Sequence, residues 1–276
     1  MMIGGYDLPL GRRTLIMGIL NITPDSFSDG GMYLDPGAAV EKAALLVDEG
    51  ADIIDIGGES SRPGSSRVSA REEAARVIPV IKRLSGKIKA PISIDTYKSE
   101  VAARALDEGA LMVNDITALR GDRRMPGTIA RENAWIVLMH MKGTPANMQK
   151  APEYGDVIAE IREFLLGAIT MAEKSGISPD HIMVDPGIGF GKTPGHNFEI
   201  LRRLDEFRSV SKRMVIGPSR KSFVGSVTGR APEERIFGTA AAVALAVAGG
   251  ADVVRVHDVA QMRDVVKVAD AIRGKN

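Results

Sequence analysis

The segment Asp52-Ile53-Ile54-Asp55-Ile56, which runs into Gly57-Gly58, shows the pattern that decides the fold of this chain. It is a short and mostly apolar run of the β-rich type. A run with helical periodicity, residues 36–49, precedes it and stops at Gly50. Short apolar strands are typical of parallel sheets covered on both faces, because neither face meets water. The segment therefore predicts one βα unit of a parallel α/β fold.

The same alternation continues along the whole chain. The predicted strands cover residues 14–20, 52–56, 92–95, 111–114, 135–140, 181–185, 213–216 and 252–256. The predicted helices cover residues 36–49, 69–84, 99–108, 154–174, 196–207, 236–248 and 259–272, with a weaker helix after Asp122. Eight βα units favour a closed (βα)8 TIM barrel over an open doubly wound sheet. We expect residues 1–276 to form one such domain.

Two local signals refine these helices and their connections. Ser69 followed by Glu72 is a capping-box pattern, whereas Pro79 predicts a kink or an early break in the same helix. The phrases at residues 49–52 (EGAD) and 248–252 (AGGAD) echo each other, and each joins a helix to the next strand. The echo is compatible with ordinary αβ-loop chemistry.

Composition narrows the class of protein. With 276 residues, 44% hydrophobic and 26% charged, the chain suits one large packed domain, although length alone also allows two small ones. A net charge of +1 and 4% aromatic residues argue against nucleic acid or an anionic membrane as partners. The absence of cysteine excludes disulfides, thiolate nucleophiles and Cys-type zinc sites. We find no signal-peptide pattern and expect a cytoplasmic location.

Polar side chains stand at or just past the C-terminal end of nearly every predicted strand. They are Asn21, Asp55 with Glu59 beyond it, Asp95, Asn114, His140, Asp185, Ser219-Arg220-Lys221, and Arg255 with His257. In a (βα)8 barrel these ends open on one face, where active sites are built. Any one of these polar residues alone is more readily explained as the start of a loop or as a helix cap. Polar residues at the same end of eight successive strands predict a shared pocket.

Two loops at that face have a composition that suits binding. Residues 21–31 form a long polar loop, which either folds over a ligand as a lid or simply makes two turns. Residues 57–65 combine glycines, hydroxyls and Arg62. That mixture suits a mobile anion-binding loop, and equally a solvated connection.

A positive cluster follows the last two predicted strands. It consists of Ser219-Arg220-Lys221-Ser222 together with Arg255 and His257. Barrels often bind phosphate at this place, so we favour a phosphate site over the alternative that Arg255 pairs with an interior carboxylate. The loop at residues 185–193 ends like a phosphate loop in Gly-Lys-Thr. Because Pro186 replaces the required first glycine, that pattern fails.

A further group of strand-end residues forms a candidate polar slot. Asp95, Asn114, Asp185 and Lys221 can pair with a flat heterocycle rich in hydrogen-bonding groups. The alternative is a buried ionic network that stabilises the barrel, for instance Asp185 with Lys221, and both can hold at once. His140 and His257 have no H-x-x-x-H partner, which argues against a histidine zinc site.

Taken together, these segments resemble the dihydropteroate synthase family of pterin-binding enzymes. The matching motifs, in family order, are GILNITPDSFSDGG (18–31), GGESSRPG (57–64), SIDT (93–96), VNDI (113–116), LMHM (138–141), DPGIGFGK (185–192), SRKS (219–222) and RVHDV (255–259). The sequence departs from the family at Ser61, where threonine is frequent, and at Pro218. These departures leave room for a related pterin enzyme.

The resemblance implies a transferase of folate biosynthesis, a target of sulfonamides, that joins 4-aminobenzoate to 6-hydroxymethyl-7,8-dihydropterin diphosphate. By motif, it implies Asp95, Lys221, Arg255 and His257 as catalytic residues, and Asp95, Asn114, Met139, Asp185 and Lys221 around the pterin. It implies Asn21, Arg255 and His257 at the diphosphate, Mg2+ near Asn21 and Asp95, and Ser61, Arg62, Pro63, Phe190 and Ser222 around 4-aminobenzoate. It also implies a homodimer.

The chemistry expected for such a site is an SN1-like substitution. Mg2+ and the positive cluster stabilise the leaving diphosphate, while the electron-rich pterin spreads the developing positive charge beside Asp95 and Asp185. Two alternatives remain. One is a pterin-binding methyltransferase domain that serves a corrinoid partner, and the other is a non-catalytic pterin-binding protein.

Overall fold

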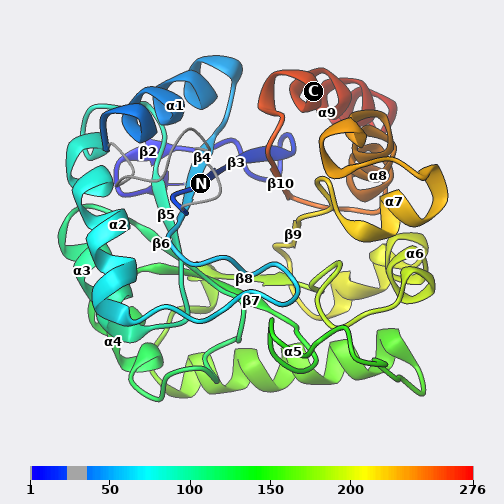
Figure 1. Cartoon of the computed structure of the whole chain (residues 1–276), viewed down its shortest axis with the longest axis horizontal. Helices are drawn as coiled ribbons and strands as arrows, with labels where there is room; N and C mark the ends of the chain where they lie inside the picture. Colours follow the sequence, from blue (N-terminus) through cyan, green and yellow to red (C-terminus); the bar gives the residue numbers. More distant parts are fainter. Residues whose placement is uncertain (1, 24–35, 276) are drawn as a thin grey trace.

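The computed structural model describes residues 2–23 and 36–275, and these form a barrel of eight parallel strands (Figure 1). The strands are β3 (Leu15–Asn21), β4 (Ile53–Gly57), β5 (Ile92–Asp95), β6 (Met112–Asp115), β7 (Trp135–Met139), β8 (Ile182–Asp185), β9 (Val215–Ile216) and β10 (Val253–Val256). Their order is β8-β7-β6-β5-β4-β3-β10-β9, and a single parallel bridge from Val184 to Met214 closes the ring between β8 and β9. The predicted TIM barrel is confirmed.

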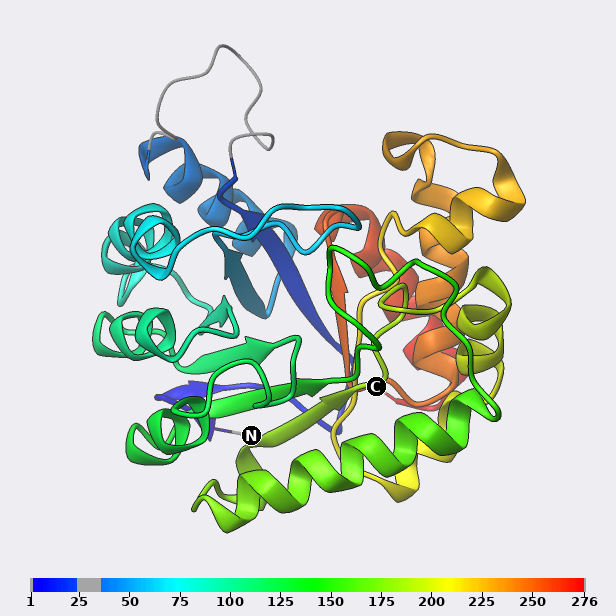
Figure 2. The same cartoon turned by 60° about the horizontal axis from the view of Figure 1, so that its bottom comes forward.

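Helices surround the strands on the outside, as Figures 1 and 2 show from two directions. They are α1 (Pro36–Glu49), α2 (Ala70–Leu84), α3 (Ser99–Asp107), α4 (Met125–Arg131), α5 (Val157–Lys174), α6 (Pro194–Arg202), α7 (Ser222–Thr228), α8 (Ile236–Ala248) and α9 (Val259–Ile272). Within the described residues, no helix is long and apolar enough to cross a membrane.

Three helical segments differ from the sequence-based expectations. Helix α2 continues through Pro79, because its apolar face, which includes Val77 and Ile81, is fully buried and packing outweighs the lost backbone hydrogen bond. The predicted helix at residues 196–207 is divided into α6 and the 3₁₀ segment Leu204–Ser209. Helix α7 was not predicted, because seven residues carry too little periodicity.

The interior of the barrel is apolar at its N-terminal end, which we call the base. Leu15 and Met17 of β3 point inward there, while Ile16 between them packs outward against the helices, as the two-residue period of a strand requires. An unpredicted hairpin, β1 (Met2–Ile3) with β2 (Tyr6–Asp7), adds Ile3 to this inner cluster. The opposite, C-terminal end, which we call the mouth, is left for polar side chains.

Candidate functional site

The centre of the mouth is a buried ionic network around Arg255. Its Nε donates to Asp55 Oδ2 at 2.6 Å and its Nη2 donates to Asp95 Oδ2 at 2.7 Å. Asn114 Nδ2 also donates to Asp55 Oδ2, at 3.0 Å. Strand register brings these groups together, since Asp95 lies opposite both Gly57 and Asn114. The structure therefore shows the alternative given above for Arg255, an ion pair with interior carboxylates.

The two carboxylates of this network are only partly compensated by their partners. Burial raises the pKa of Asp95 to about 7, although the charge of Arg255 opposes the shift. Asp55 is completely buried, and its Oδ1 finds no hydrogen-bond partner among the described residues. Two carboxylates thus share one guanidinium, and one oxygen is left without a donor. Unsatisfied buried groups of this kind are uncommon outside functional sites.

Gly57 creates open space between two oxygen-bearing side chains. A Cβ added at Gly57 would lie 3.5 Å from Asn21 Oδ1 and 3.5 Å from Asp95 Cβ, so a larger residue would fill the gap between them. Amide and carboxylate oxygens are the ligands that Mg2+ prefers, usually with substrate phosphates and water completing the octahedron. Among the described residues no group of three or more His, Asp or Glu could hold a metal alone. Asn21 and Asp95 therefore fit a metal that also binds a phosphorylated substrate.

Asp185 and Lys221 form the opposite wall without a direct ion pair. Asp185 Oδ1 accepts from the Gly187 amide at 2.6 Å, and Lys221 Nζ donates to the Ile188 carbonyl. The ammonium also lies 4.4 Å from the centre of the Phe190 ring. Burial lowers the pKa of Lys221 to about 8, opposed by the charge of Asp185. The pairing of Asp185 with Lys221, given above as the alternative to a ligand slot, is therefore only a through-space attraction.

His257 adds a hydrogen-bonding group to the cluster and not a positive charge. Burial lowers the pKa of His257 to about 3, helped by the charges of Arg255 and Arg220, so its ring is neutral near pH 7. The Ser219 hydroxyl lies 3.0 Å from His257 Nδ1 and also accepts from the His257 amide at 3.3 Å. In the tautomer in which the Ser219 hydroxyl donates to Nδ1, the ring proton lies on Nε2. The sequence groups His257 with the positive cluster, and its lowered pKa favours the neutral ring.

The loop between Ser219 and Ser222 is fixed by its central arginine. Arg220 has a left-handed φ of 58°, and its Nε donates to Asp258 Oδ2 at 3.0 Å, with a second contact to Oδ1. Its amide donates to Thr239 Oγ1 at 3.0 Å. The pair ties the loop after β9 to the loop after β10. Arg220 thereby positions Lys221 and is itself already neutralised.

The residues implied for 4-aminobenzoate come from three loops and are only partly assembled. Ser61 shares a small hollow with Asp95, and Arg62 lies close enough for its charge to lower the pKa of His257. In the part of the chain that the structure describes, no hydrogen bond joins Ser61, Arg62 or Pro63 to Phe190 or Ser222. Residues 24–31, named above as part of a lid, lie outside the described residues.

The sequence pattern missed the roles of three buried residues. Asp55 was noted only as a strand-end residue, yet it anchors Arg255. His140 is buried, with its Nδ1 2.9 Å from Lys192 Nζ and its ring edge-on against Phe164. Lys192 is 2% exposed and also donates to the Phe190 carbonyl at 2.9 Å. A glycine-flanked lysine gives no signal of such inward burial.

Comparison with known proteins agrees with this geometry. A family described as pterin binding enzyme matches residues 17–257. The dihydropteroate synthase of Synechocystis is 48% identical over 263 residues, 95% of this chain and 91% of that protein. The Xanthomonas albilineans dihydropteroate synthase with 4-aminobenzoic acid is 44% identical, with a TM-score of 0.92 and coverage of 98% and 97%. The Yersinia pestis enzyme in complex with a sulfonamide drug is 38% identical, with a TM-score of 0.94 and 99% coverage of both chains.

Proposed function

Since the chain belongs to the dihydropteroate synthases within the pterin-binding enzyme family, we propose how its barrel mouth performs their reaction. The reaction joins 4-aminobenzoate to 6-hydroxymethyl-7,8-dihydropterin diphosphate and gives 7,8-dihydropteroate and pyrophosphate. The observation that carries the proposal is the Arg255 network on one wall of a polar slot, in which Arg255 donates to Asp55 and Asp95 and Asn114 donates to Asp55. Lys221 and Asp185 form the other wall.

The slot suits a flat pterin ring. The Asp95 and Asp185 carboxyls and the Asn114 amide present acceptors and donors along the edge of the ring, and the Lys221 ammonium donates to it. Met139, buried at the end of β7, supplies an apolar contact for its face. The Arg255 guanidinium can stack on the pterin while it remains paired with Asp95. We therefore assign the pterin to these residues.

The diphosphate leaves toward Arg255, Asn21 and His257. In the proposed reaction, Arg255 and Lys221 attract the departing oxygens. The neutral His257 ring donates from Nε2 in the tautomer in which Nδ1 accepts from the Ser219 hydroxyl. Mg2+ held by Asn21 and Asp95 would supply further neutralisation of the phosphates. The geometry of Asn21 and Asp95 over Gly57 supports that metal.

Ionisation of the C–O bond leaves positive charge on the pterin methylene, which is the SN1-like course. Asp95 in its charged form and Asp185 stabilise that charge electrostatically. The aniline nitrogen of 4-aminobenzoate then attacks and loses its proton to solvent or to the leaving diphosphate. The loop carrying Ser61, Arg62 and Pro63, with Phe190 and Ser222 opposite, is proposed to hold the aryl amine. A relative from Xanthomonas binds 4-aminobenzoic acid, which supports this acceptor.

A homodimer and a cytoplasmic location belong to the same proposal. Large apolar side chains on α8 and α9 are exposed: Phe237 is 87% exposed, Leu245 60% and Ile272 83%. Since α8 and α9 pack side by side, these side chains form a surface that a second copy would cover. A sequence without cysteine suits a reducing compartment.

The test is to incubate the purified protein with Mg2+, the pterin diphosphate and 4-aminobenzoate and to follow both products by mass spectrometry. Dihydropteroate and pyrophosphate should appear together, and both should vanish in Lys221→Ala. Tight pterin binding without either product would instead favour the methyltransferase-type or the non-catalytic alternative. The positive cluster of Lys221 and Arg255 favours diphosphate chemistry over methyl transfer.

A further inference from the structure

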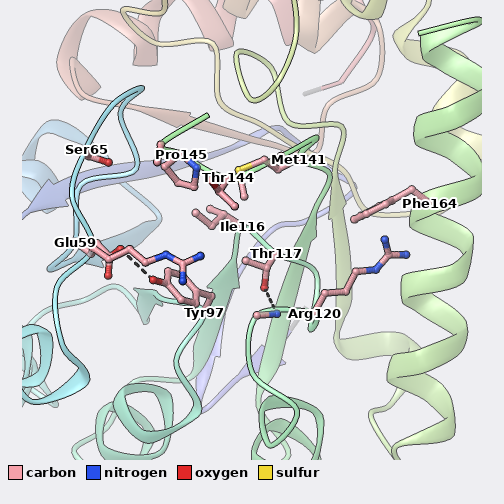
Figure 3. Close-up of a pocket in the computed structure, with 14 residues that line it drawn as sticks. Glu59, Ser65, Tyr97, Ile116, Thr117, Arg120, Met141, Thr144, Pro145 and Phe164 are labelled. Atoms are coloured by element: carbon pink, nitrogen blue, oxygen red, sulfur yellow. Dashed lines mark hydrogen bonds between the residues drawn. The ribbon is translucent and has the colours of Figure 1, made fainter. Parts of the chain in front are cut away.

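A second cavity of about 350 Å3 lies beside the pterin slot, among the loops that follow β4, β5, β6 and β7. Figure 3 shows Glu59 and Tyr97 on one side of it, Arg120 and Phe164 on the other, and Ile116 between them. Its volume is within the usual range of small-molecule sites, roughly 300–1,000 Å3. The catalytic mechanism makes no use of it.

The cavity is adjacent to the pterin slot but distinct from it. Asp95, Asn114, Asp185 and Lys221 are absent from its lining. Instead, residues two positions farther along the same segments line it: Tyr97 after Asp95, Ile116 after Asn114, and Met141 after Met139. The cavity therefore lies farther out along the loops on this side of the mouth. It shares Glu59, Tyr97, Ile116 and Pro145 with the small hollow that Ser61 and Asp95 line.

Two guanidinium groups on this cavity are free to bind an anion. Arg67 Cζ lies 5.9 Å from the centre of the Tyr97 ring, and Arg120 Cζ lies 3.8 Å from that of Phe164. Within the described residues, neither guanidinium group makes an ion pair or a hydrogen bond. An aromatic ring holds the face of a guanidinium and leaves its N–H edge available.

The carboxylate that borders the cavity does not neutralise these arginines. Glu59 forms an ion pair with Lys98, and its Oε1 accepts from the Tyr97 hydroxyl at 3.1 Å. Among the described lining residues no other acidic side chain is present. Lys98 also pairs with Glu73, so Lys98, Glu59 and Glu73 together carry one negative charge against the two arginines, and a net positive charge is left for a ligand.

The walls between the two arginines combine apolar side chains with the hydroxyls of Thr117 and Thr144. Ile116, Met141 and Pro145 line the middle of the cavity, whereas each guanidinium stands beside an aromatic ring near one of its sides. We propose that this cavity is a binding site for a small aromatic dianion, with an apolar centre against Ile116 and an anionic group at each of Arg67 and Arg120. Bidentate pairing of a carboxylate with guanidinium would fix each end.

The position of the cavity couples it to the aryl amine side of the mouth. The Gly64 amide donates to the Pro145 carbonyl at 3.0 Å, which joins the loop carrying Ser61 and Arg62 to the loop after β7. Ser65 and Pro145 both line the cavity, so an occupant would hold these two loops together. A bound dianion is then expected to lower the KM for 4-aminobenzoate. This coupling, unlike the binding itself, rests on the proposed function.

Calorimetric titration with isophthalate tests the site, using protein saturated with 7,8-dihydropteroate so that the pterin and aryl sites are filled. One molecule should bind per chain. Arg67→Met and Arg120→Met should each weaken binding about tenfold, the value of one charge-assisted contact. The matched control is Arg124→Met, which removes an exposed arginine outside the lining that lies 3.5 Å from Asp122, and it should bind as the unchanged protein does.

Three results would overturn the proposal: no binding of isophthalate, binding that disappears when dihydropteroate is present, or binding that neither arginine variant weakens. Benzoate, with one carboxylate, should bind about tenfold more weakly than isophthalate, and equal affinity would contradict the two-ended site. The KM for 4-aminobenzoate, measured with and without isophthalate, tests the coupling. If the protein makes no dihydropteroate, the proposed function fails, while titration of the free protein still decides the cavity.

Discussion

The base and the mouth of the barrel both bury aspartates, but they satisfy them differently. At the base, Asp52 accepts from the Ile16 amide at 2.9 Å and from Arg13 at 2.8 Å. Asp252 repeats the arrangement with the Met214 amide at 2.9 Å and Arg208 at 2.8 Å. Each base aspartate thus has its own arginine and a backbone donor.

At the mouth, by contrast, Asp55 and Asp95 share Arg255, and Asp55 Oδ1 has no partner among the described residues. The pKa of Asp95 is raised to about 7, so part of its cost of ionisation is left uncompensated. Aspartate therefore stabilises the fold at the base of the barrel, whereas at the mouth it remains available for a ligand. This division follows the general rule for TIM barrels.

Replacing one arginine at each end of the barrel by methionine gives the largest expected difference in turnover. Arg255→Met leaves two carboxylates unpaired, so we expect turnover to fall about a thousandfold and unfolding free energy to fall by about 3 kcal/mol. Arg208→Met at the base should lower unfolding free energy by about 1 kcal/mol and leave kcat within about twofold. Steady-state kinetics and urea unfolding measure both. Equal loss of turnover in the two variants would remove the distinction between base and mouth.

Neutralising one aspartate at each end sharpens the comparison. Asp95→Asn should lower kcat about a hundredfold, because the cationic pterin loses its counter-charge, without loss of stability. Asp252→Asn should cost about 2 kcal/mol of unfolding free energy and leave kcat unchanged, because it weakens a buried pair far from the chemistry. Near-normal turnover of Asp95→Asn would show that Asp95 has no electrostatic role.

The pH dependence tests the raised pKa of Asp95. Since its charged form is the active one, kcat/KM should rise with pH and level off above about 7, and Asp95→Asn should lose this limb. The folded state binds this proton more tightly than the unfolded state. Its contribution to stability is therefore complete below the ordinary pKa of 3.8 and is lost as pH rises through about 7. A flat profile from pH 5 to 8 would contradict the assignment.

The smallest expected effect concerns Lys192, a buried lysine whose pKa is lowered well below its usual value by burial and which contacts only neutral acceptors. Lys192→Met removes its hydrogen bonds to the Phe190 carbonyl and to His140. We expect kcat/KM for 4-aminobenzoate to fall about tenfold through the displacement of Phe190, with a smaller change for the pterin substrate. Equal losses for both substrates would indicate a general loss of structure.

The sequence anticipated the elements whose patterns are long and regular, and it missed the short ones. The predicted helices 36–49, 236–248 and 259–272 match α1, α8 and α9, which are 13 or 14 residues long. The echo at residues 49–52 and 248–252 is also explained, since Asp52 and Asp252 perform the same task at the base. The two-residue strands of the N-terminal hairpin are too short to leave a pattern.

Within the site, strand-end positions were predictable but their partners were not. Asp95, Asn114, Asp185 and Arg255 come together because every strand ends at the same face. The pairing of Asp55 with Arg255 joins residues 200 positions apart, and the neutral state of His257 depends on burial. Neither follows from spacing along the chain.

The closure of the barrel between β8 and β9 has a mechanical consequence. One bridge, Val184 to Met214, holds this seam, and β9 spans only two residues. Asp185 follows on one side of the seam, and Lys221 lies on the loop of the other side. A pterin that contacts both residues would link the two sides of the seam and stabilise the closed barrel. Amide protons of β8 and β9 should then exchange more slowly with solvent deuterium in the bound protein than in the free one, and the melting temperature should rise with ligand concentration.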